Sequence, residues 1–209
     1  MEAKKNCPCR SRSLKENLEF WRKMLSTDKK AQLKEGSAVV RFKSSMQNAN
    51  PAMRDFPLAR INEASHPQQR KKYRVWPLMN LAVAVDDIEL KMTHIIRAKD
   101  HRDNAARQEM IFKALGKKYP WSAFLGKYKF NDIDLSKRAM RQAIEEGKYT
   151  GWDDLRLPTI ASLRKQGYKP QAFLRFAVRV GLSENDKIMY RAEYFKLLDY
   201  FNKENKNNF

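Results

Sequence analysis

Two short basic segments hold the side chains best suited to binding anions. Ser136, Lys137 and Arg138 stand where a helix is expected to begin, so a hydroxyl, backbone N–H groups and an ammonium could meet one phosphate together. Arg97 ends a β-branched run, and its planar guanidinium could hold a carboxylate through two hydrogen bonds. The same residue types also describe an ordinary N-cap followed by solvated bases, and a surface arginine paired with a nearby aspartate. Residue type and spacing leave both interpretations open.

The net charge points to an anionic partner. The chain of 209 residues carries 43 lysines and arginines against 24 aspartates and glutamates, a formal charge of +19. A surplus of this size favours binding to a polyanion, because lysines and arginines that neutralise its phosphates release condensed counterions. Nucleic acid is the first candidate, and lysines kept for solubility are the alternative. Charge separates neither RNA from DNA nor binding from catalysis.

Two cysteines, Cys7 and Cys9, are the only ones in the chain. They are too close in sequence for an ordinary disulfide, and a framework of bridges is excluded. A C-x-C pair can supply two of the four ligands that zinc prefers, but His66 and His94 lie in unrelated segments. A complete zinc site within the chain is not expected, and the missing ligands would have to come from another chain.

Hydrophobic residues make up 42% of the sequence, enough for a real core. No apolar run approaches the roughly 20 residues needed to span a bilayer, and residues 1–13 lack the apolar stretch of a signal peptide. We therefore expect a cytoplasmic protein with no membrane partner.

The first third of the chain is expected to begin with a helix. Ser13 and Glu16 have the spacing of a capping box, and apolar residues then recur at helical intervals to give one apolar face: Leu14, Leu18, Trp21 and Leu25. Residues 38–43 have the composition of a short strand. Residues 44–74 are polar and rich in turn formers, which indicates a subdomain or insertion rather than a core element.

The middle of the chain predicts a strand, helix, strand series. Residues 78–90 favour a helix, and residues 93–97 a buried parallel strand. Asp103 can cap the next helix, which Gly116 ends and whose inward residues are expected to be Ile111, Ala114 and Leu115. A second strand is expected over residues 121–130. The series indicates a βαβ unit and hence an α/β fold with a parallel sheet.

The rest of the chain is expected to be helical. Helices are predicted over residues 136–146, 159–166 and 170–180, each ended by a glycine, with Pro170 at a first helical position. Ser183 is expected to begin the last helix, with Ile188, Ala192 and Phe195 facing inward.

Four motifs carry a resemblance to a known family. They are residues 76–87 (W-P-L-M-N-L-A-V-A-V-D-D), 93–101 (T-H-I-I-R-A-K-D-H), 133–138 (I-D-L-S-K-R) and 151–159 (G-W-D-D-L-R-L-P-T). In order and spacing they resemble the glutamyl/glutaminyl branch of the class I aminoacyl-tRNA synthetases, and the archaeal glutamyl type most closely. The resemblance extends from about Cys7 to about Asp199. The last motif beside the L-S-K-R loop is highly specific, whereas L-S-K-R alone carries almost no information.

The resemblance implies a fold and a domain organisation. Residues 1–72 would be the remainder of a mixed α/β insertion that binds the tRNA acceptor stem. Residues 73–135 would be the second half of a Rossmann-like catalytic domain, and residues 136–209 the signature loop and a helical junction domain. The implied reaction is ATP-dependent activation of glutamate and its transfer to tRNA, with Mg²⁺ accompanying the triphosphate.

The resemblance also implies roles for residues at the nucleotide site. Residues 135–138 match the family's second signature, usually written K-M-S-K-S, so that Lys137 and Ser136 are the expected catalytic residues. Leu135 and Arg138 complete the ATP-binding loop, and Asp100 and His101 stand at the family's positions near the adenosine and the tRNA 3′ end.

Three residues match the family's amino-acid pocket. Arg97 matches the arginine that resembles a clamp for the substrate's side-chain carboxylate, and Met79 and Asn80 fall in the pocket-lining segment. Bacterial members have a tyrosine at the position of Met79 and an asparagine at that of Val83. This departure leaves the pocket donors, and the choice between glutamate and glutamine, undetermined. Asn80 is the better candidate for a contact.

Two expected parts of the family are missing from the sequence. The first signature, H-I-G-H, should stand upstream, yet the three histidines at 66, 94 and 101 include no Gly-His pair, and no anticodon-binding barrels follow. We therefore expect an N-terminal synthetase half to act in trans, with zinc held through Cys7 and Cys9 if that half supplies two more ligands. The chain would be a natural subunit or a gene fragment, and the expected partners are tRNA and L-glutamate, not DNA. A non-catalytic tRNA-binding module is the alternative, and a tRNA-modifying relative ranks last.

Overall fold

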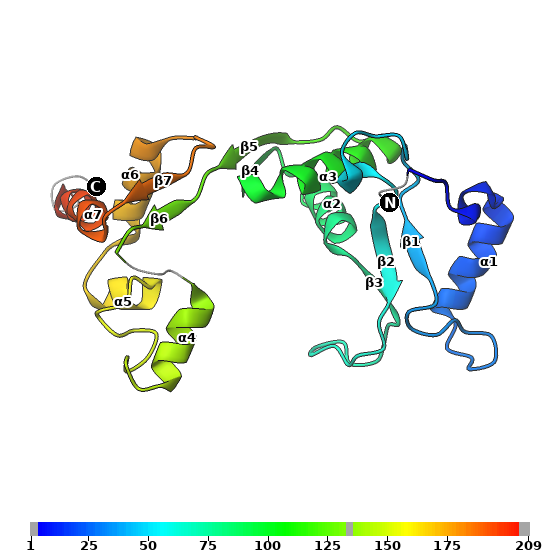
Figure 1. Ribbon diagram of the computed structural model, residues 1–209, viewed down its shortest axis with the longest axis horizontal. Coiled ribbons are helices and arrows are strands. Elements are labelled where there is room, and N and C mark those ends of the chain that lie inside the picture. Colours follow the sequence, from blue (N-terminus) through cyan, green and yellow to red (C-terminus); the bar gives the residue numbers. More distant parts are fainter. Residues whose placement is uncertain (1–3, 133–135, 205–209) are drawn as a thin grey trace. The chain divides into compact units, whose positions relative to one another are not determined.

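The computed structural model describes residues 4–132 and 136–204, a mixed α/β chain (Figure 1). Its contacts divide it into two compact units. Unit 1 comprises Met1–Ile95 and Asp100–Ser122, and unit 2 comprises Ile96–Lys99 and Ala123–Phe209. The division runs through two paired strands, β4 (His94–Ala98) and β5 (Trp121–Leu125), so that each unit holds part of both.

Unit 1 is built on a three-stranded antiparallel sheet with β2 (Pro57–Ile61) between β1 (Val39–Arg41) and β3 (Val75–Pro77). Two helices, α2 (Met79–Glu89) and α3 (Arg102–Ala114), pack on one another beside it. Their shared core consists of buried apolar residues: Phe56, Ala84, Ile111 and Phe112.

The prediction that residues 44–74 contain no core element is wrong, whereas their assignment to an insertion stays a prediction. This stretch contains a 3₁₀ turn, η2 (Pro51–Met53), and the central strand β2. Phe56 and Ile61 are among the most deeply buried side chains in the described part of the chain. The error has a physical reason: the apolar residues of a short strand between prolines are too few to stand out against polar neighbours.

The first helix, α1 (Leu14–Leu25), begins as predicted. The Ser13 hydroxyl accepts a hydrogen bond from the Glu16 N–H at 3.2 Å, and the Glu16 carboxylate accepts one from the Ser13 N–H at 2.7 Å. The four residues of its predicted apolar face are nevertheless all exposed: Leu14, Leu18, Trp21 and Leu25. Met24 is the helix residue that is buried.

Strands β4 and β5 pair with one another and flank α3 in sequence, as the predicted strand, helix, strand series requires. Only Ile95 of β4 is buried. Asp103 does not cap α3: it lies in the first turn and accepts a hydrogen bond from the Asn50 amide at 2.8 Å. Ile111 faces inward as predicted, whereas Leu115 is exposed and Phe112 takes its place in the core.

Unit 2 contains a parallel pair of strands that the sequence did not predict, β6 (Tyr128–Phe130) with β7 (Lys187–Met189). The single strand predicted over residues 121–130 is therefore two strands. The helix predicted from Ser183 is also wrong, because this segment forms β7 and Ile188 is an exposed strand residue. The last helix, α7, spans Arg191–Glu204.

The remaining helices of unit 2 begin close to their predicted positions. They are α4 (Lys137–Glu145), α5 (Ile160–Lys165) and α6 (Pro170–Val180). Ser136 and Thr159 cap α4 and α5 through their hydroxyls, and Pro170 occupies the first turn of α6. Helix α6 packs on α7 around four buried residues, Ala172, Phe176, Leu198 and Phe201 (Figure 1). No helix within residues 4–132 and 136–204 is long and apolar enough to cross a membrane.

Candidate functional site

The start of α2 places the two predicted pocket residues differently. Met79 is exposed, whereas Asn80 is buried and its Oδ1 accepts a hydrogen bond from Gln108 Nε2 at 3.3 Å. Gln108 is fully buried, and its own Oε1 has no hydrogen-bond partner among the described residues. The sequence interpretation missed Gln108, although its spacing of three and four residues from Ile111 and Phe112 puts it on the buried face of α3. The buried amide pair holds the Asn80 side chain in one orientation.

The end of β4 leads directly into the next group of candidates. Arg97 is half-buried in β4, and Asp100 and His101 lie exposed in a 3₁₀ turn, η3 (Lys99–His101), before α3. His101 Nδ1 lies 3.0 Å from Asn104 Nδ2. A strand end followed by a helix is where α/β folds bind ligands.

One carboxylate fastens the residues after Arg97 to the rest of unit 2. Asp186 accepts bonds from Lys99 Nζ at 2.8 Å and from the Lys127 N–H at 2.8 Å, and it pairs with Lys129 at 3.2 Å. These three donors, Lys99 first, hold the pKa of the Asp186 carboxyl well below its usual range. The sequence predicts that Asp186 helps to begin a helix. In the structure it precedes β7 and links this segment to Lys99, Lys127 and Lys129.

The signature loop is described from Ser136 onward, and Leu135 lies outside the described residues. The Ser136 hydroxyl accepts a hydrogen bond from the Ala139 N–H at 3.3 Å and caps α4. Lys137 and Arg138 follow in the first helical turn, and both are exposed. An exposed helix N-terminus next to two cations is suited to binding a phosphate group.

The candidate residues are divided between the two units. Met79, Asn80 and the pair at positions 100 and 101 belong to unit 1, whereas Arg97 and residues 136–138 belong to unit 2. Their convergence on a single substrate stays a prediction.

The G-W-D-D-L-R-L-P-T motif of residues 151–159 forms a rigid turn around Asp154. This buried carboxylate accepts hydrogen bonds from the Thr150 N–H at 2.9 Å, the Arg156 N–H at 3.0 Å and Arg156 Nε at 2.9 Å. The bonds from Arg156 and from the Thr150 N–H keep the pKa of Asp154 far below its usual value. Thr159 caps α5 and also donates to the Trp152 carbonyl. Asp154, Arg156 and Thr159 of this motif therefore each stabilise the local fold.

Cys7 and Cys9 come together at η1 (Pro8–Ser11), with their sulfur atoms 2.9 Å apart. Hydrogen bonds from Cys9 and Arg41 lower the pKa of the Cys7 thiol to about 7, which favours the thiolate that a metal requires. No third histidine, cysteine, aspartate or glutamate joins them within the described residues. The pair fits two positions of a tetrahedral zinc site and cannot complete one.

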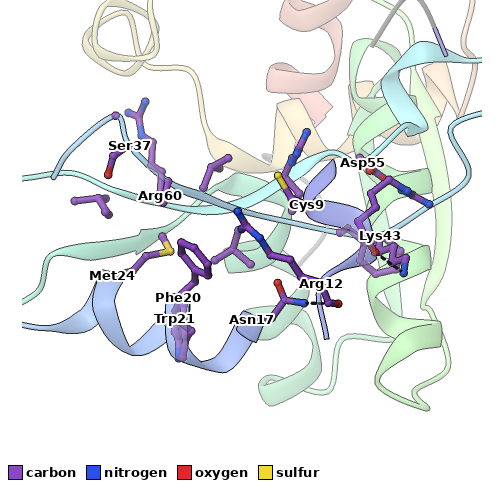
Figure 2. A pocket seen from close by; sticks show the side chains of 18 of the residues that line it. Cys9, Arg12, Asn17, Phe20, Trp21, Met24, Ser37, Lys43, Asp55 and Arg60 are labelled. Atoms are coloured by element: carbon purple, nitrogen blue, oxygen red, sulfur yellow. Dashed lines mark hydrogen bonds and ion pairs between the residues drawn. The ribbon is translucent and has the colours of Figure 1, made fainter. Parts of the chain in front are cut away.

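A cavity of about 770 Å³ lies in unit 1 between α1 and β1 (Figure 2). Phe20 and Met24 line it from the helix. Its charged lining is mostly basic, with five cationic side chains (Arg10, Arg12, Arg41, Lys43 and Arg60) against two carboxylates. Burial raises the pKa of Asp55, yet hydrogen bonds from Arg10 and the Ser44 N–H hold it below its usual value, so the carboxylate is charged. The remaining positive charge makes this part of unit 1 attractive to anions.

Comparison with known proteins agrees with these features. Residues 1–205 match the family model described as tRNA synthetases class I (E and Q), catalytic domain. The chain is 45% identical over 181 residues to the glutamate–tRNA ligase of Thermococcus kodakarensis, covering 86% of this chain and 31% of that protein. The glutamate–tRNA ligase of Methanothermobacter marburgensis is 43% identical over 185 residues, covering 88% and 32%. The chain spans about a third of the length of these relatives. It belongs to the class I glutamyl and glutaminyl tRNA synthetases, and its match lies in their catalytic domain.

Proposed function

We propose that this chain is part of a glutamate–tRNA ligase, as one subunit or as a fragment, and that it contains the second half of the catalytic domain. Residues 1–72 would precede it as the end of an acceptor-binding insertion, residues 73–135 would form the half-domain, and residues 136–209 the signature loop and junction. The family match over residues 1–205 and the 45% identity to an archaeal glutamate–tRNA ligase support this proposal. We place the protein in the cytoplasm.

The proposed reaction has two steps. The α-carboxylate of glutamate attacks the α-phosphorus of ATP, the bond to the β-phosphate oxygen breaks, and pyrophosphate leaves. The glutamyl group then passes from AMP to a terminal hydroxyl of tRNA. Mg²⁺, when bound with ATP, would neutralise part of the triphosphate charge.

Lys137 would meet the negative charge that develops on the triphosphate, and Ser136 and Arg138 would bind phosphate oxygens beside it. The observation that carries this assignment is the start of α4, where Ser136 caps the helix and Lys137 and Arg138 stand exposed in its first turn. Leu135 would complete the loop, and Asp100 and His101 would contact the adenosine side of the nucleotide. Such groups hold the reactants in place and stabilise the charge of the transition state, which are the main requirements for catalysis of adenylation.

Arg97 would bind the side-chain carboxylate of glutamate through its guanidinium fork. Asn80 would contact the substrate from the start of α2, supported by its burial and its bond to Gln108. Met79, which is exposed, would border the pocket without donating a hydrogen bond.

The site would be incomplete without a second half that carries H-I-G-H, because groups that act as a unit lose nearly all activity when part of the unit is missing. Cys7 and Cys9 would supply two zinc ligands, and the other half would supply two more. The zinc would then be structural and would link the halves.

Glutamylation of tRNA in a two-part enzyme tests the proposal. An N-terminal half taken from an archaeal relative is mixed with this chain, and charging of tRNA with glutamate is measured. We expect charging in the mixture, and Arg97→Gln should raise the KM for glutamate by about 100-fold with little change in the KM for ATP, as for a lost bidentate charge contact. A folded, associated mixture that binds tRNA without charging it would instead support the non-catalytic tRNA-binding module.

A further inference from the structure

The connection between β2 and β3 is a β-hairpin of well-defined shape. This basic hairpin, residues 62–74, is closed at its base by a hydrogen bond from the Asn62 N–H to the Arg74 carbonyl at 2.9 Å. Near its tip, His66 and Arg70 exchange two backbone hydrogen bonds, at 2.9 and 2.8 Å. A loop of this length is thus a folded arm rather than a loose connection.

His66 organises the tip of the basic hairpin with its side chain. Its Nδ1 accepts hydrogen bonds from the Gln68 N–H at 3.2 Å and the Gln69 N–H at 3.1 Å. Its ring stacks on Trp76 of β3 with centroids 4.7 Å apart and planes 12° from parallel. Tyr73 meets the same Trp76 edge-on at 6.0 Å. The turn is therefore held both by hydrogen bonds and by a platform of rings.

Arg74 anchors the root of the hairpin. Its guanidinium donates to the carbonyls of Ser26 at 2.7 Å and Leu33 at 2.9 Å, and it pairs with Glu63 at 2.6 Å. The arm is consequently fixed to the segment that follows α1 within unit 1.

The tip of this arm carries concentrated positive charge. Arg70, Lys71 and Lys72 are all exposed, and no aspartate or glutamate occurs from residue 64 to residue 85. Within the part of the chain that the structure describes, none of the three forms an ion pair. Lys72 lies over the Tyr73 ring, with Nζ 5.2 Å from its centroid. These charges are available to a partner.

The backbone of Arg70 gives a second indication of function. Its φ is +52°, in the left-handed region that glycine or asparagine would occupy at lower cost. Residues other than glycine held in this region cost free energy, and such residues cluster at active sites and ligand-binding sites. The chain thus keeps an arginine where turn chemistry alone favours a different residue.

We infer that the basic hairpin is a preformed arm that binds the phosphate backbone of RNA through Arg70, Lys71 and Lys72, and that His66 keeps the arm in shape for it. The inference rests on the proposed function, because RNA is the polyanion that a tRNA ligase holds. Cations carried on a backbone that is already ordered lose less conformational entropy on binding than cations on a flexible loop. Phosphate contacts of this kind position an RNA without reading its sequence.

The charge of the arm is tested by comparing two triple variants of the 209-residue chain. One is Arg70→Ala with Lys71→Ala and Lys72→Ala. The control removes three exposed lysines of the same unit outside the hairpin, at positions 29, 30 and 34. Affinity for a tRNA transcript is measured by fluorescence anisotropy from low to moderate salt.

The hairpin variant should bind tRNA about 10-fold more weakly at low salt. The slope of the logarithm of its affinity against the logarithm of the salt concentration should become shallower by roughly 2, as for three lost phosphate contacts. Equal losses in both variants would overturn the inference.

The role of His66 is tested without changing the charge of the tip. His66→Ala removes the Nδ1 acceptor, whereas His66→Asn offers a side-chain oxygen that can accept from the same two N–H groups. We expect the alanine variant to lose about fivefold in RNA affinity through poorer preorganisation, with faster amide hydrogen exchange at Gln68 and Gln69. The asparagine variant should recover most of both. Unchanged affinity in the alanine variant, or an asparagine variant as weak as alanine, would contradict the role of His66.

These measurements separate the inference from the proposed function. RNA binding by the chain is measured without ATP, glutamate or a second half. A chain that binds tRNA through the hairpin but never supports glutamylation would retain the inference and remove the proposed reaction. A two-part enzyme that charges tRNA equally well with the hairpin triple variant, at the same KM for tRNA, would remove the inference and retain the reaction.

Discussion

Gly126 lies directly against the backbone of Asn185: a Cβ built on Gly126 would fall 2.2 Å from the Asn185 carbonyl oxygen. The Gly126 N–H also donates to the Ser183 carbonyl at 2.9 Å. Next to it, the Lys127 N–H donates to the carboxylate of Asp186 at 2.8 Å. This close approach brings the two segments together just before they pair as β6 and β7.

Replacing Gly126 by alanine should destabilise unit 2. The added methyl meets backbone atoms that cannot rotate away, so the strands must move apart. We expect a loss of about 2 kcal/mol or more in the free energy of unfolding, seen as faster amide exchange across β6 and β7. Gly151→Ala is the matched control, because its Cβ would meet only the Asp153 side chain at 3.2 Å. A Gly126 variant as stable as the Gly151 variant would show that the close approach is not required.

Asp154→Asn should lower the thermal stability at neutral pH by a few degrees. The amide cannot accept all the hydrogen bonds that Arg156 and the Thr150 N–H give to the carboxylate. Because the folded state lowers the pKa of Asp154, its contribution is fully present above the unfolded pKa of about 4 and is lost as the pH falls further.

The stability difference between the wild type and Asp154→Asn should therefore be constant from pH 7 to about 5 and shrink below about 4. Asp153→Asn is the neighbouring control. Asp153 is exposed and pairs with Lys165 at the surface, so this change should have little effect. A difference that grows on acidification would contradict the assignment.

Local signals explain the parts of this fold that the sequence predicts. Ser13, Ser136 and Thr159 each cap a helix through their own hydroxyl, and Pro170 begins another, because these interactions involve neighbouring residues only. The preference for Asn80 over Met79 as a pocket contact stays a prediction, although Asn80 is buried and hydrogen-bonded to Gln108 whereas Met79 is exposed.

Long-range pairing explains the parts that the sequence did not predict. Strand β7 pairs with β6, and the paired residues are far apart in the sequence. Tyr128, for example, pairs with Lys187, 59 positions later. Apolar spacing alone is ambiguous for so short a segment. The burial of Gln108 likewise depends on its contact with α2, and a polar residue gives no hydrophobic signal to reveal it. The apolar residues of α1 formed a helical stripe in sequence, yet periodicity cannot say whether anything covers them.

Lys137→Ala in the two-part enzyme should slow adenylation by about 100-fold or more, the size expected for a lost transition-state charge contact. Affinity for tRNA should change much less. The measurement is single-turnover formation of the adenylate, with Lys196→Ala on α7 as a control that removes an exposed lysine of the same unit. Equal losses of adenylation and tRNA affinity would make Lys137 an RNA-contacting residue.

The central proposal is that this chain holds one side of an adenylation site whose other side carries H-I-G-H. Its sequence has the L-S-K-R loop but no H-I-G-H, and exposed apolar residues of β4 and β5, Ile96 and Trp121, offer surface that a second half could cover. Glutamate-dependent exchange between ATP and pyrophosphate tests this most directly. We predict no exchange by the chain alone and clear exchange once an N-terminal half with H-I-G-H is added. Robust exchange by the isolated chain would contradict the account.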